Sequence, residues 1–86
     1  MVWKIKFDKR AEEKFKKLDK QIQKRIAIFL DEKLAVDPVR HSTLLVGSYN
    51  KFARARVGDY RIIFELKNDE LIIIIINIDH RSKIYQ

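Results

Sequence analysis

The chain has 86 residues, 47% of them hydrophobic, which predicts a single folded domain spanning residues 1–86. It carries 19 Lys and Arg against 12 Asp and Glu, and this formal net charge of +7 favours an acidic partner such as nucleic acid or an acidic protein. The absence of cysteine excludes disulfides, a thiolate metal site and a cysteine nucleophile.

Neither a targeting segment nor a membrane span is expected. The N-terminal residues 1–6 lack the apolar run of a signal peptide. The isoleucine run at 72–76 is far too short to cross a bilayer. We therefore expect a soluble cytoplasmic protein with no membrane partner.

The first 37 residues predict one strand followed by two helices. Residues 1–7 alternate between apolar and basic side chains, as an amphipathic strand does. Asp8 is a suitable N-cap for a short helix through about Leu18, and Asp19 for a second helix. This second helix ends at Asp37-Pro38, because the residue before a proline avoids helical geometry. The apolar positions expected to face the core are Trp3, Ile5, Phe7, Ala11, Phe15, Leu18, Ile22, Ile26, Phe29, Leu30 and Leu34.

Residues 53–64 predict a β-hairpin with one apolar face and one basic face. Gly58-Asp59 is a two-residue turn signal, with glycine at the first position, as a type II′ turn requires. Pairing outward from this turn places Arg56 directly opposite Arg61. Because side chains alternate along a strand, one face receives Ala53, Ala55, Val57, Tyr60, Ile62 and Phe64, and the other receives Arg54, Arg56 and Arg61.

These three arginines are either a solvated sheet surface or an anion-binding site. Like charges directly opposite each other destabilise a sheet by up to about 1 kcal/mol, so stability alone does not favour Arg56 opposite Arg61. A planar guanidinium grips phosphate with two hydrogen bonds and stacks on bases. All three residues are arginine in a chain rich in lysine, which favours the anion-binding interpretation.

Residues 71–78 are apolar on both faces and predict a central strand after a turn at 67–70. Its second neighbour is then the N-terminal strand, which gives an α+β fold of order β-α-α-β-β-β, a mainly antiparallel sheet and both helices on one side. The predicted register pairs Leu66 with Leu71 and Ile63 with Ile74. A turn with an odd number of residues would instead exchange the two faces of the strand after it. It places Leu71, Ile73 and Ile75 in the core, and Ile72, Ile74, Ile76, Ile78 and His80 on the arginine face. An exposed apolar stripe of this kind marks a surface for an apolar helix or extended peptide of another protein.

The predicted register also brings His80 close to the paired arginines, with Arg81 and Tyr85 following in the chain. Guanidinium groups, an imidazole and a phenol suit phosphoryl transfer on RNA, in which a ribose 2′-hydroxyl attacks its own phosphate. Tyr85 would stack on an unpaired base. The alternatives are a structural role for His80 at a strand end and a packing role for Tyr85.

The sequence indicates neither a metal nor a cofactor. Two histidines without clustered acids do not make a metal site, and His41 is interpreted as an incidental loop residue. The chain has no glycine-rich loop that would cradle the phosphates of a nucleotide.

Residues 49–85 resemble the RelE/ParE superfamily of toxins from toxin–antitoxin systems, through the run Arg54–Phe64 and the closing run His80–Tyr85. The resemblance covers nearly the whole chain, since the leading strand and the paired helices also fit that family, and it implies the two-layer RelE-like fold. RelE-like members are ribonucleases that enter the ribosomal A site and cut the mRNA there without a metal. Their antitoxin wraps the toxin and blocks its active face.

The resemblance also implies residue roles. Arg61 and Arg81 match positions that stabilise the scissile phosphate, Tyr85 matches a tyrosine that stacks on mRNA, and Arg54 lies on the strand that supplies further basic residues. The other residues expected to contact RNA are Arg56, Lys51 and Lys83. Well-known RelE-type enzymes carry two lysines on this strand, one of them thought to act as the base, where this chain has Phe52 and Arg54. Because arginine stays protonated, we expect His80 to replace that base, with Lys51 as the second candidate.

Two other functions compete with the ribonuclease. ParE-like members share the fold but inhibit DNA gyrase, and the joint presence of Arg54, Arg61, Arg81 and Tyr85 argues against that function. A simple nucleic-acid-binding module explains the charge but not the paired arginines. The expected partners are the ribosome, mRNA and an acidic antitoxin, and we expect a monomer alone and a hetero-oligomer with the antitoxin. The residues predicted to bind this antitoxin are Ile72, Ile74, Ile76 and Ile78.

Overall fold

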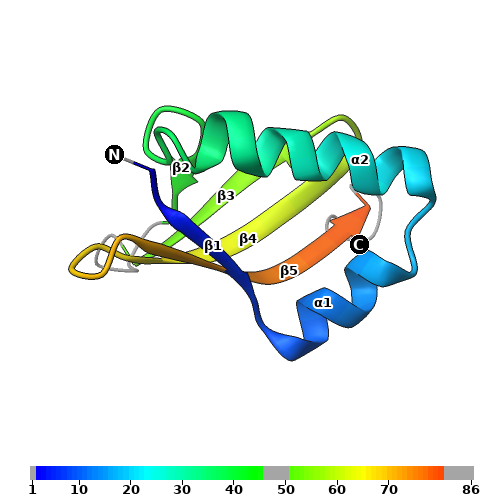
Figure 1. Ribbon diagram of the computed structural model, residues 1–86, viewed down its shortest axis with the longest axis horizontal. Helices are drawn as coiled ribbons and strands as arrows, with labels where there is room; N and C mark the ends of the chain where they lie inside the picture. The colour runs from blue at the N-terminus through cyan, green and yellow to red at the C-terminus, as the bar shows by residue number, and fades with distance from the viewer. Residues whose placement is uncertain (1, 46–50, 81–86) are drawn as a thin grey trace.

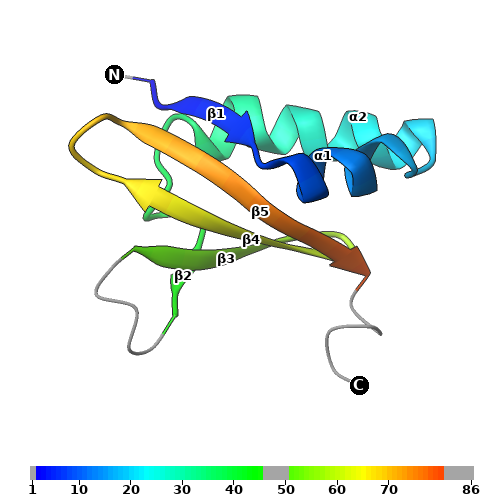
Figure 2. The same ribbon diagram turned by 90° about the horizontal axis from the view of Figure 1, so that it is seen from below.

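The computed structural model describes residues 2–45 and 51–80, whose five strands form one sheet in the order β1-β5-β4-β3-β2 (Figure 1). Both helices lie on one side of this sheet (Figure 2). These observations confirm the predicted α+β fold class and the position of β5 between β1 and β4. The element bounds are β1 Lys4–Phe7, α1 Lys9–Lys16, α2 Lys20–Phe29, η1 Leu30–Leu34, β2 Thr43–Leu44, β3 Phe52–Val57, β4 Tyr60–Lys67 and β5 Ile72–His80. The short strand β2 was not predicted.

Helix α1 packs against the part of β5 that β1 leaves uncovered. Strand β1 runs parallel to β5 and pairs only with residues 72–75, so the second half of β5 meets α1 instead. Asp8 caps this helix as predicted, its Oδ1 accepting a hydrogen bond from the backbone N–H of Ala11 at 3.0 Å. Lys14 Nζ reaches across to Asn77 Oδ1 at 2.8 Å and to Asp79 Oδ2 at 3.0 Å. These contacts hold α1 beside the end of β5.

Helix α2 lies across the sheet and continues into η1, a single π-helical turn. Asp19 occupies the predicted N-cap position, but its side chain makes no capping hydrogen bond. The π turn was not predicted; in it the backbone N–H of Ala35 donates to the carbonyl of Leu30 at 2.8 Å. Within the described residues, no helix combines the length and apolar character that crossing a membrane requires.

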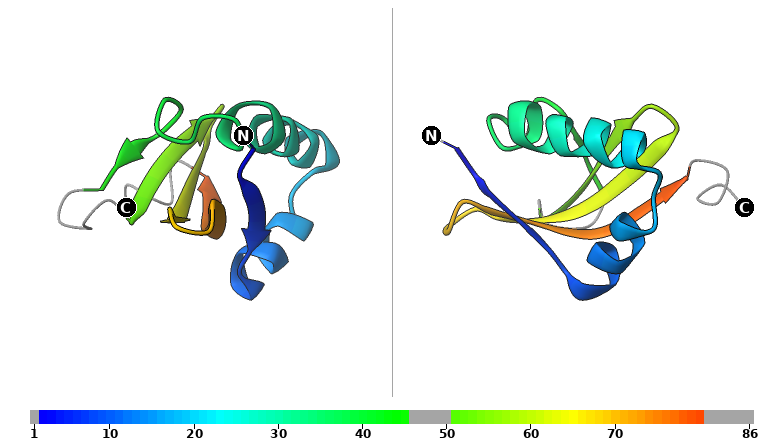
Figure 3. Two further views of the ribbon diagram at one scale, coloured as in Figure 1. Left: turned by 60° about the vertical axis from the view of Figure 1, so that its left-hand side comes forward. Right: turned by 45° about the vertical axis from the view of Figure 1, so that its right-hand side comes forward.

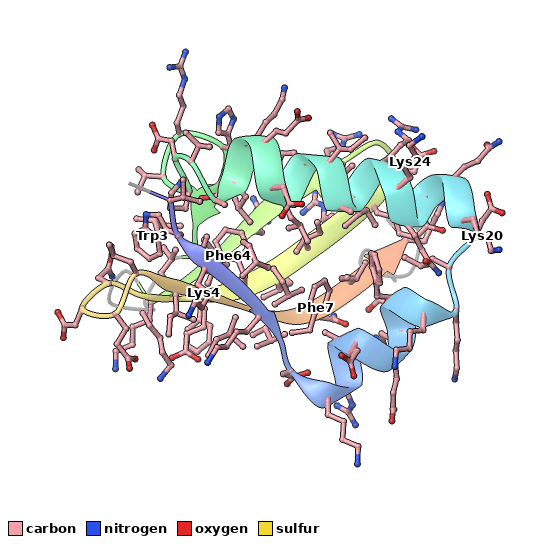
Figure 4. All side chains as sticks on the ribbon, in the orientation of Figure 1. Trp3, Lys4, Phe7, Lys20, Lys24 and Phe64 are labelled. Atoms are coloured by element: carbon pink, nitrogen blue, oxygen red, sulfur yellow. The ribbon has the colours of Figure 1, made fainter. Side chains whose placement is uncertain are left out.

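The core lies between the helices and the sheet. Figure 4 shows Phe7 and Phe64 in this layer, whereas Lys20 and Lys24 point away from it. The other face of the sheet is covered by neither described helix (Figure 3). The fully buried large side chains of the core are Phe64, Ile26, Leu34, Ile62, Ile73, Ile75 and Ile78.

The β3–β4 hairpin has the predicted register. Val57 pairs with Tyr60 and Arg56 with Arg61. Gly58 adopts a φ of 58°, and among the described non-glycine residues only Leu71 has a positive φ, so the turn fits type II′. Ala53, Ala55, Ile62 and Phe64 are buried on the helix side, which places the three arginines on the uncovered face.

The β4–β5 register differs from the prediction in two ways. Leu66 pairs with Ile73 rather than with Leu71, which lies in the turn with a φ of 55° and is only half-buried. This shift of two residues leaves the alternation of faces unchanged. Further along, Phe64 pairs with Ile75 but Ile63 pairs with Asn77, so Ile76 is the extra residue of a β-bulge.

The bulge inverts the faces of everything that follows it in β5. Ile72, Ile74 and Ile76 are half-buried on the uncovered face, as predicted. Ile78 is 2% exposed and belongs to the core, so its predicted place on the arginine face is wrong. The same inversion moves His80 from the uncovered face to the helix side of the sheet. Asp79 takes its place on the uncovered face, where it pairs with Arg61.

Two alanine variants test the bulge. We expect Ile78→Ala to lower the free energy of unfolding by about 2–5 kcal/mol, because it opens a cavity in the core. Ile76→Ala removes the same atoms from a half-buried position and is expected to cost clearly less. The measurement is denaturant unfolding of both variants beside the parent protein. A larger loss for Ile76→Ala than for Ile78→Ala would contradict the bulge.

Candidate functional site

The three arginines of the hairpin lie on the face that the helices leave open. Arg54 and Arg56 are exposed on β3, and Arg61 is half-buried on β4 opposite Arg56. The edge strand β2 pairs only with Ala53 and Arg54. Just beyond β2, the backbone N–H of Leu45 donates to the carbonyl of Phe52 of β3 at 3.0 Å.

The loop between η1 and β2 is held in a fixed shape by two side chains. Asp37 Oδ1 accepts a hydrogen bond from the backbone N–H of Arg40 at 3.2 Å, and the Ser42 hydroxyl donates to the carbonyl of Pro38 at 2.5 Å. The ring of His41 packs edge-on against Phe29 of α2, with ring centroids 6.4 Å apart. The loop thereby presents Arg40 and His41 towards β3.

Together the loop, helix and hairpin enclose a hollow of about 510 Å³, which we call the basic groove. Its described lining contains five cationic side chains, one imidazole, two hydroxyls and no carboxylate. A concave surface lined by one sign of charge concentrates ligands of the opposite sign, and arginine matches the geometry of phosphate. The lining residues are Phe29, Lys33, Arg40, His41, Ser42, Thr43, Arg54, Ala55, Arg56 and Arg61.

Asp79 is the acidic residue nearest the arginines in the strand register, since it pairs with Arg61 across β4 and β5. Its carboxylate forms a salt bridge with Lys14 of α1. The side chain of Asp79 is 22% exposed and that of Lys14 is 40% exposed. Lys14 offsets the negative charge of Asp79. The groove thus keeps its strongly positive character despite this neighbouring carboxylate.

His80 lies on the helix side of the sheet, not beside the arginines as predicted. It pairs with Tyr60, and the two rings meet edge-on with centroids 5.3 Å apart. Both line a separate hollow of about 240 Å³, whose other lining residues are the apolar Ile22, Ile26 and Val57 and the charged Arg25 and Asp59. The predicted position is wrong because the bulge at Ile76 turns every later side chain of β5 over.

Lys51, a described residue that was also predicted to contact RNA, does not line the basic groove. Lys51 borders a different hollow at the β4–β5 turn, together with Glu65, Asp69 and Glu70. Arg81, Lys83 and Tyr85 lie outside the described residues. In the described part of the chain, no three His, Asp or Glu side chains cluster as metal ligands.

The sequence predicts His41 to be an incidental loop residue because nothing near it in the chain suggests a site, but the structure places it in the lining of the basic groove. Its position depends on Phe29 and on the loop hydrogen bonds of Asp37 and Ser42. The one local signal is the turn-forming Asp37-Pro38, which marks a shaped loop but not what faces it.

Comparison with solved structures places the fold among RelE toxins. The chain superimposes on a protein of the RelBE2 toxin–antitoxin complex from Mycobacterium tuberculosis with a TM-score of 0.85 and 23% identity, covering 95% of this chain and 94% of that one. The match to the archaeal RelE–RelB complex from Pyrococcus horikoshii OT3 has a TM-score of 0.74 and 24% identity, and it covers 96% of this chain and 99% of that one. The match to the RelB–RelE antitoxin–toxin complex from Methanococcus jannaschii has a TM-score of 0.71 and 28% identity, and it covers 94% of this chain and 95% of that one.

Sequence comparison points to the same superfamily. No curated protein gives a significant match. The model of the ParE toxin of type II toxin–antitoxin systems matches residues 5–85, almost the full length of the chain. The protein therefore belongs to the ParE toxin family of type II toxin–antitoxin systems, within the RelE/ParE superfamily.

Proposed function

We propose that this toxin is a ribosome-dependent mRNA endoribonuclease that inhibits translation. The observation that supports this proposal most strongly is the basic groove, in which five cations and no carboxylate meet among the described lining residues. Such a lining suits the phosphodiester backbone of RNA. The likeness to RelE structures and the resemblance of the arginine-rich hairpin to ribonuclease members support the same function.

In the proposed reaction, a ribose 2′-hydroxyl attacks the adjacent phosphate of the bound mRNA. The new bond joins the 2′-oxygen to phosphorus, and the bond from phosphorus to the 5′-oxygen breaks, leaving a 2′,3′-cyclic phosphate and a 5′-hydroxyl. Arg61 and Arg54 are proposed to hold the phosphate oxygens as negative charge develops on them. Arg56 is proposed to bind the neighbouring phosphate of the RNA backbone. In the free protein its Nε donates to the carbonyl oxygen of Gly58 at 3.4 Å.

The resemblance adds three residues to this proposal. Arg81 is assigned to the scissile phosphate, Tyr85 to stacking on an mRNA base and Lys83 to the RNA backbone. All three extend the set of cationic and aromatic groups that unstacked RNA requires. They come from the chain segment that directly follows β5.

The second candidate is inhibition of DNA gyrase, which the matching ParE toxin family favours. Two assays on the purified toxin separate the candidates: cleavage of mRNA on programmed ribosomes and supercoiling of plasmid DNA by gyrase. We expect mRNA cleavage at low toxin concentration and unchanged supercoiling. Inhibited supercoiling without mRNA cleavage would overturn the ribonuclease function.

We further propose an acidic antitoxin that covers the uncovered face of the sheet. Ile72, Ile74 and Ile76 form an apolar strip there, which we call the isoleucine patch. In the sheet register, Lys4 and Lys67 flank Ile72 on either side. An apolar segment with acidic neighbours fits such a surface, and the matched solved structures include complexes of toxin with antitoxin.

A further inference from the structure

We propose that His41 is the general base that removes the proton from the attacking 2′-hydroxyl, an inference that rests on the proposed ribonuclease function. His41 comes from the loop before β2, a segment without chemical motifs of its own. The groove geometry brings it to the arginines of the hairpin.

The basic groove contains a single side chain of a type suited to accept a proton near neutral pH, among its described lining residues. Its other charged side chains are one lysine and four arginines, residue types whose cationic form has no proton-accepting site. The hydroxyls of Ser42 and Thr43 are too weakly basic to hold a proton there. Among the described lining residues, His41 alone is of a type that exchanges a proton between about pH 5 and 8.

His41 also lies among the cations that would hold the phosphate. His41 is half-buried, and its ring packs against Phe29 of α2 with ring centroids 6.4 Å apart. The charged groups that share the groove with it are Lys33 of η1, Arg40 of its own loop, Arg54 and Arg56 of β3 and Arg61 of β4. A phosphate held by these cations would place its ribose within the same hollow.

The two residues that the sequence predicts as candidates for the base lie outside the basic groove. His80 packs against Tyr60 in the hollow on the helix side. Lys51 borders the hollow at the β4–β5 turn. Neither hollow shares a lining residue with the basic groove.

The proton balance of the step is simple. A ring nitrogen of neutral His41 accepts the proton of the 2′-hydroxyl as the 2′-oxygen bonds to phosphorus. The 5′-oxygen leaves with the electrons of its bond to phosphorus and takes a proton from water. Since a neutral imidazole is required to accept this proton, we expect cleavage to rise with pH.

The test is single-turnover cleavage of mRNA on programmed ribosomes between about pH 5 and 8. We expect His41→Gln to lower the rate by about 10²–10⁴-fold, the usual contribution of a general base, and to flatten the rise with pH. His80→Gln is the matched control and should keep both the rate and the rise. His41→Ala should regain part of its activity when imidazole is added, which a purely structural role would not produce.

The outcomes separate the two proposals. Cleavage by His41→Gln with the parent rate and pH profile overturns the role of His41 and leaves the ribonuclease function standing. Loss of the pH-dependent rise in His80→Gln instead of His41→Gln does the same and assigns the base to His80. Absence of any cleavage by the parent protein overturns the ribonuclease function and the role of His41 with it. Thermal unfolding of each variant shows whether a lost activity reflects a lost fold.

Discussion

Replacing Arg61 by alanine is expected to lower mRNA cleavage about 10²–10³-fold while leaving the fold intact. Arg61 stands opposite Arg56 on the uncovered face of the sheet and lines the basic groove. Its guanidinium is proposed to stabilise the charge that develops on the phosphate, so its loss affects the transition state directly. The hydrophobic core is built by residues of the opposite face, such as Ile62 and Phe64. The measurement is the cleavage rate on programmed ribosomes, with circular dichroism to verify folding.

Two further variants make this result specific. Arg25→Ala removes the same charge from α2 on the helix side, where the guanidinium lies over Gly58, and is expected to keep the parent rate. Arg61→Lys keeps a positive charge but loses the planar pair of donors, and should fall between the parent protein and Arg61→Ala. A folded Arg61→Ala protein with the parent cleavage rate would rule out the proposed role.

Ile74→Glu is expected to weaken antitoxin binding by at least about 100-fold, which corresponds to roughly 3 kcal/mol. Ile74 is the centre of the isoleucine patch and is flanked by Lys6 of β1 and Glu65 of β4. Burying apolar surface contributes about 25 cal/mol per Å² to association, whereas a carboxylate at this point would carry a desolvation cost and would add negative charge facing the acidic antitoxin. The measurement is titration calorimetry of the toxin with its antitoxin.

Ile28→Glu provides the matched control for this variant. Ile28 lies on α2, on the other side of the molecule, and is 46% exposed. The same change of charge and shape there should leave the affinity unaltered. Equal affinity of the parent protein and Ile74→Glu would show that the antitoxin docks away from the isoleucine patch.

The hairpin was predictable because its signals are local. Gly58 supplies the positive φ of the turn, and the alternation on either side of it then determines which residues face the helices. Arg56 opposite Arg61 follows from these two observations alone. The caps and apolar spacing of the first helix are equally local, and Asp8 binds the N–H of Ala11 as expected.

The second half of β5 was not predictable by the same reasoning. Five consecutive isoleucines offer the same side chain at each position, so nothing in residues 72–76 marks where the strand gains an extra residue. The bulge at Ile76 is a property of the pairing of β5 with β4 and not of residues 72–76 alone. That single residue moves Ile78 into the core and His80 away from the arginines.

The lining of the basic groove likewise contains residues that the local sequence places correctly and residues that it does not. The arginines of β3 and β4 were placed correctly because a strand period determines their face. Lys33, Arg40 and His41 come from a helix end and a loop, and only the packing of α2 across the sheet brings them to β3. A contact between segments so far apart in the chain leaves no pattern in either of them.

The central claim is that the basic groove holds a scissile phosphate that is attacked by its own ribose. The most direct test uses programmed ribosomes carrying an mRNA with a single 2′-deoxynucleotide at the mapped cleavage position, beside the unmodified mRNA. We predict that the toxin cuts the unmodified mRNA to a 2′,3′-cyclic phosphate and a 5′-hydroxyl, and that the 2′-deoxy substitution abolishes cleavage at that position. Cleavage of the 2′-deoxy mRNA at the same position, or no cleavage of either mRNA, would contradict the claim.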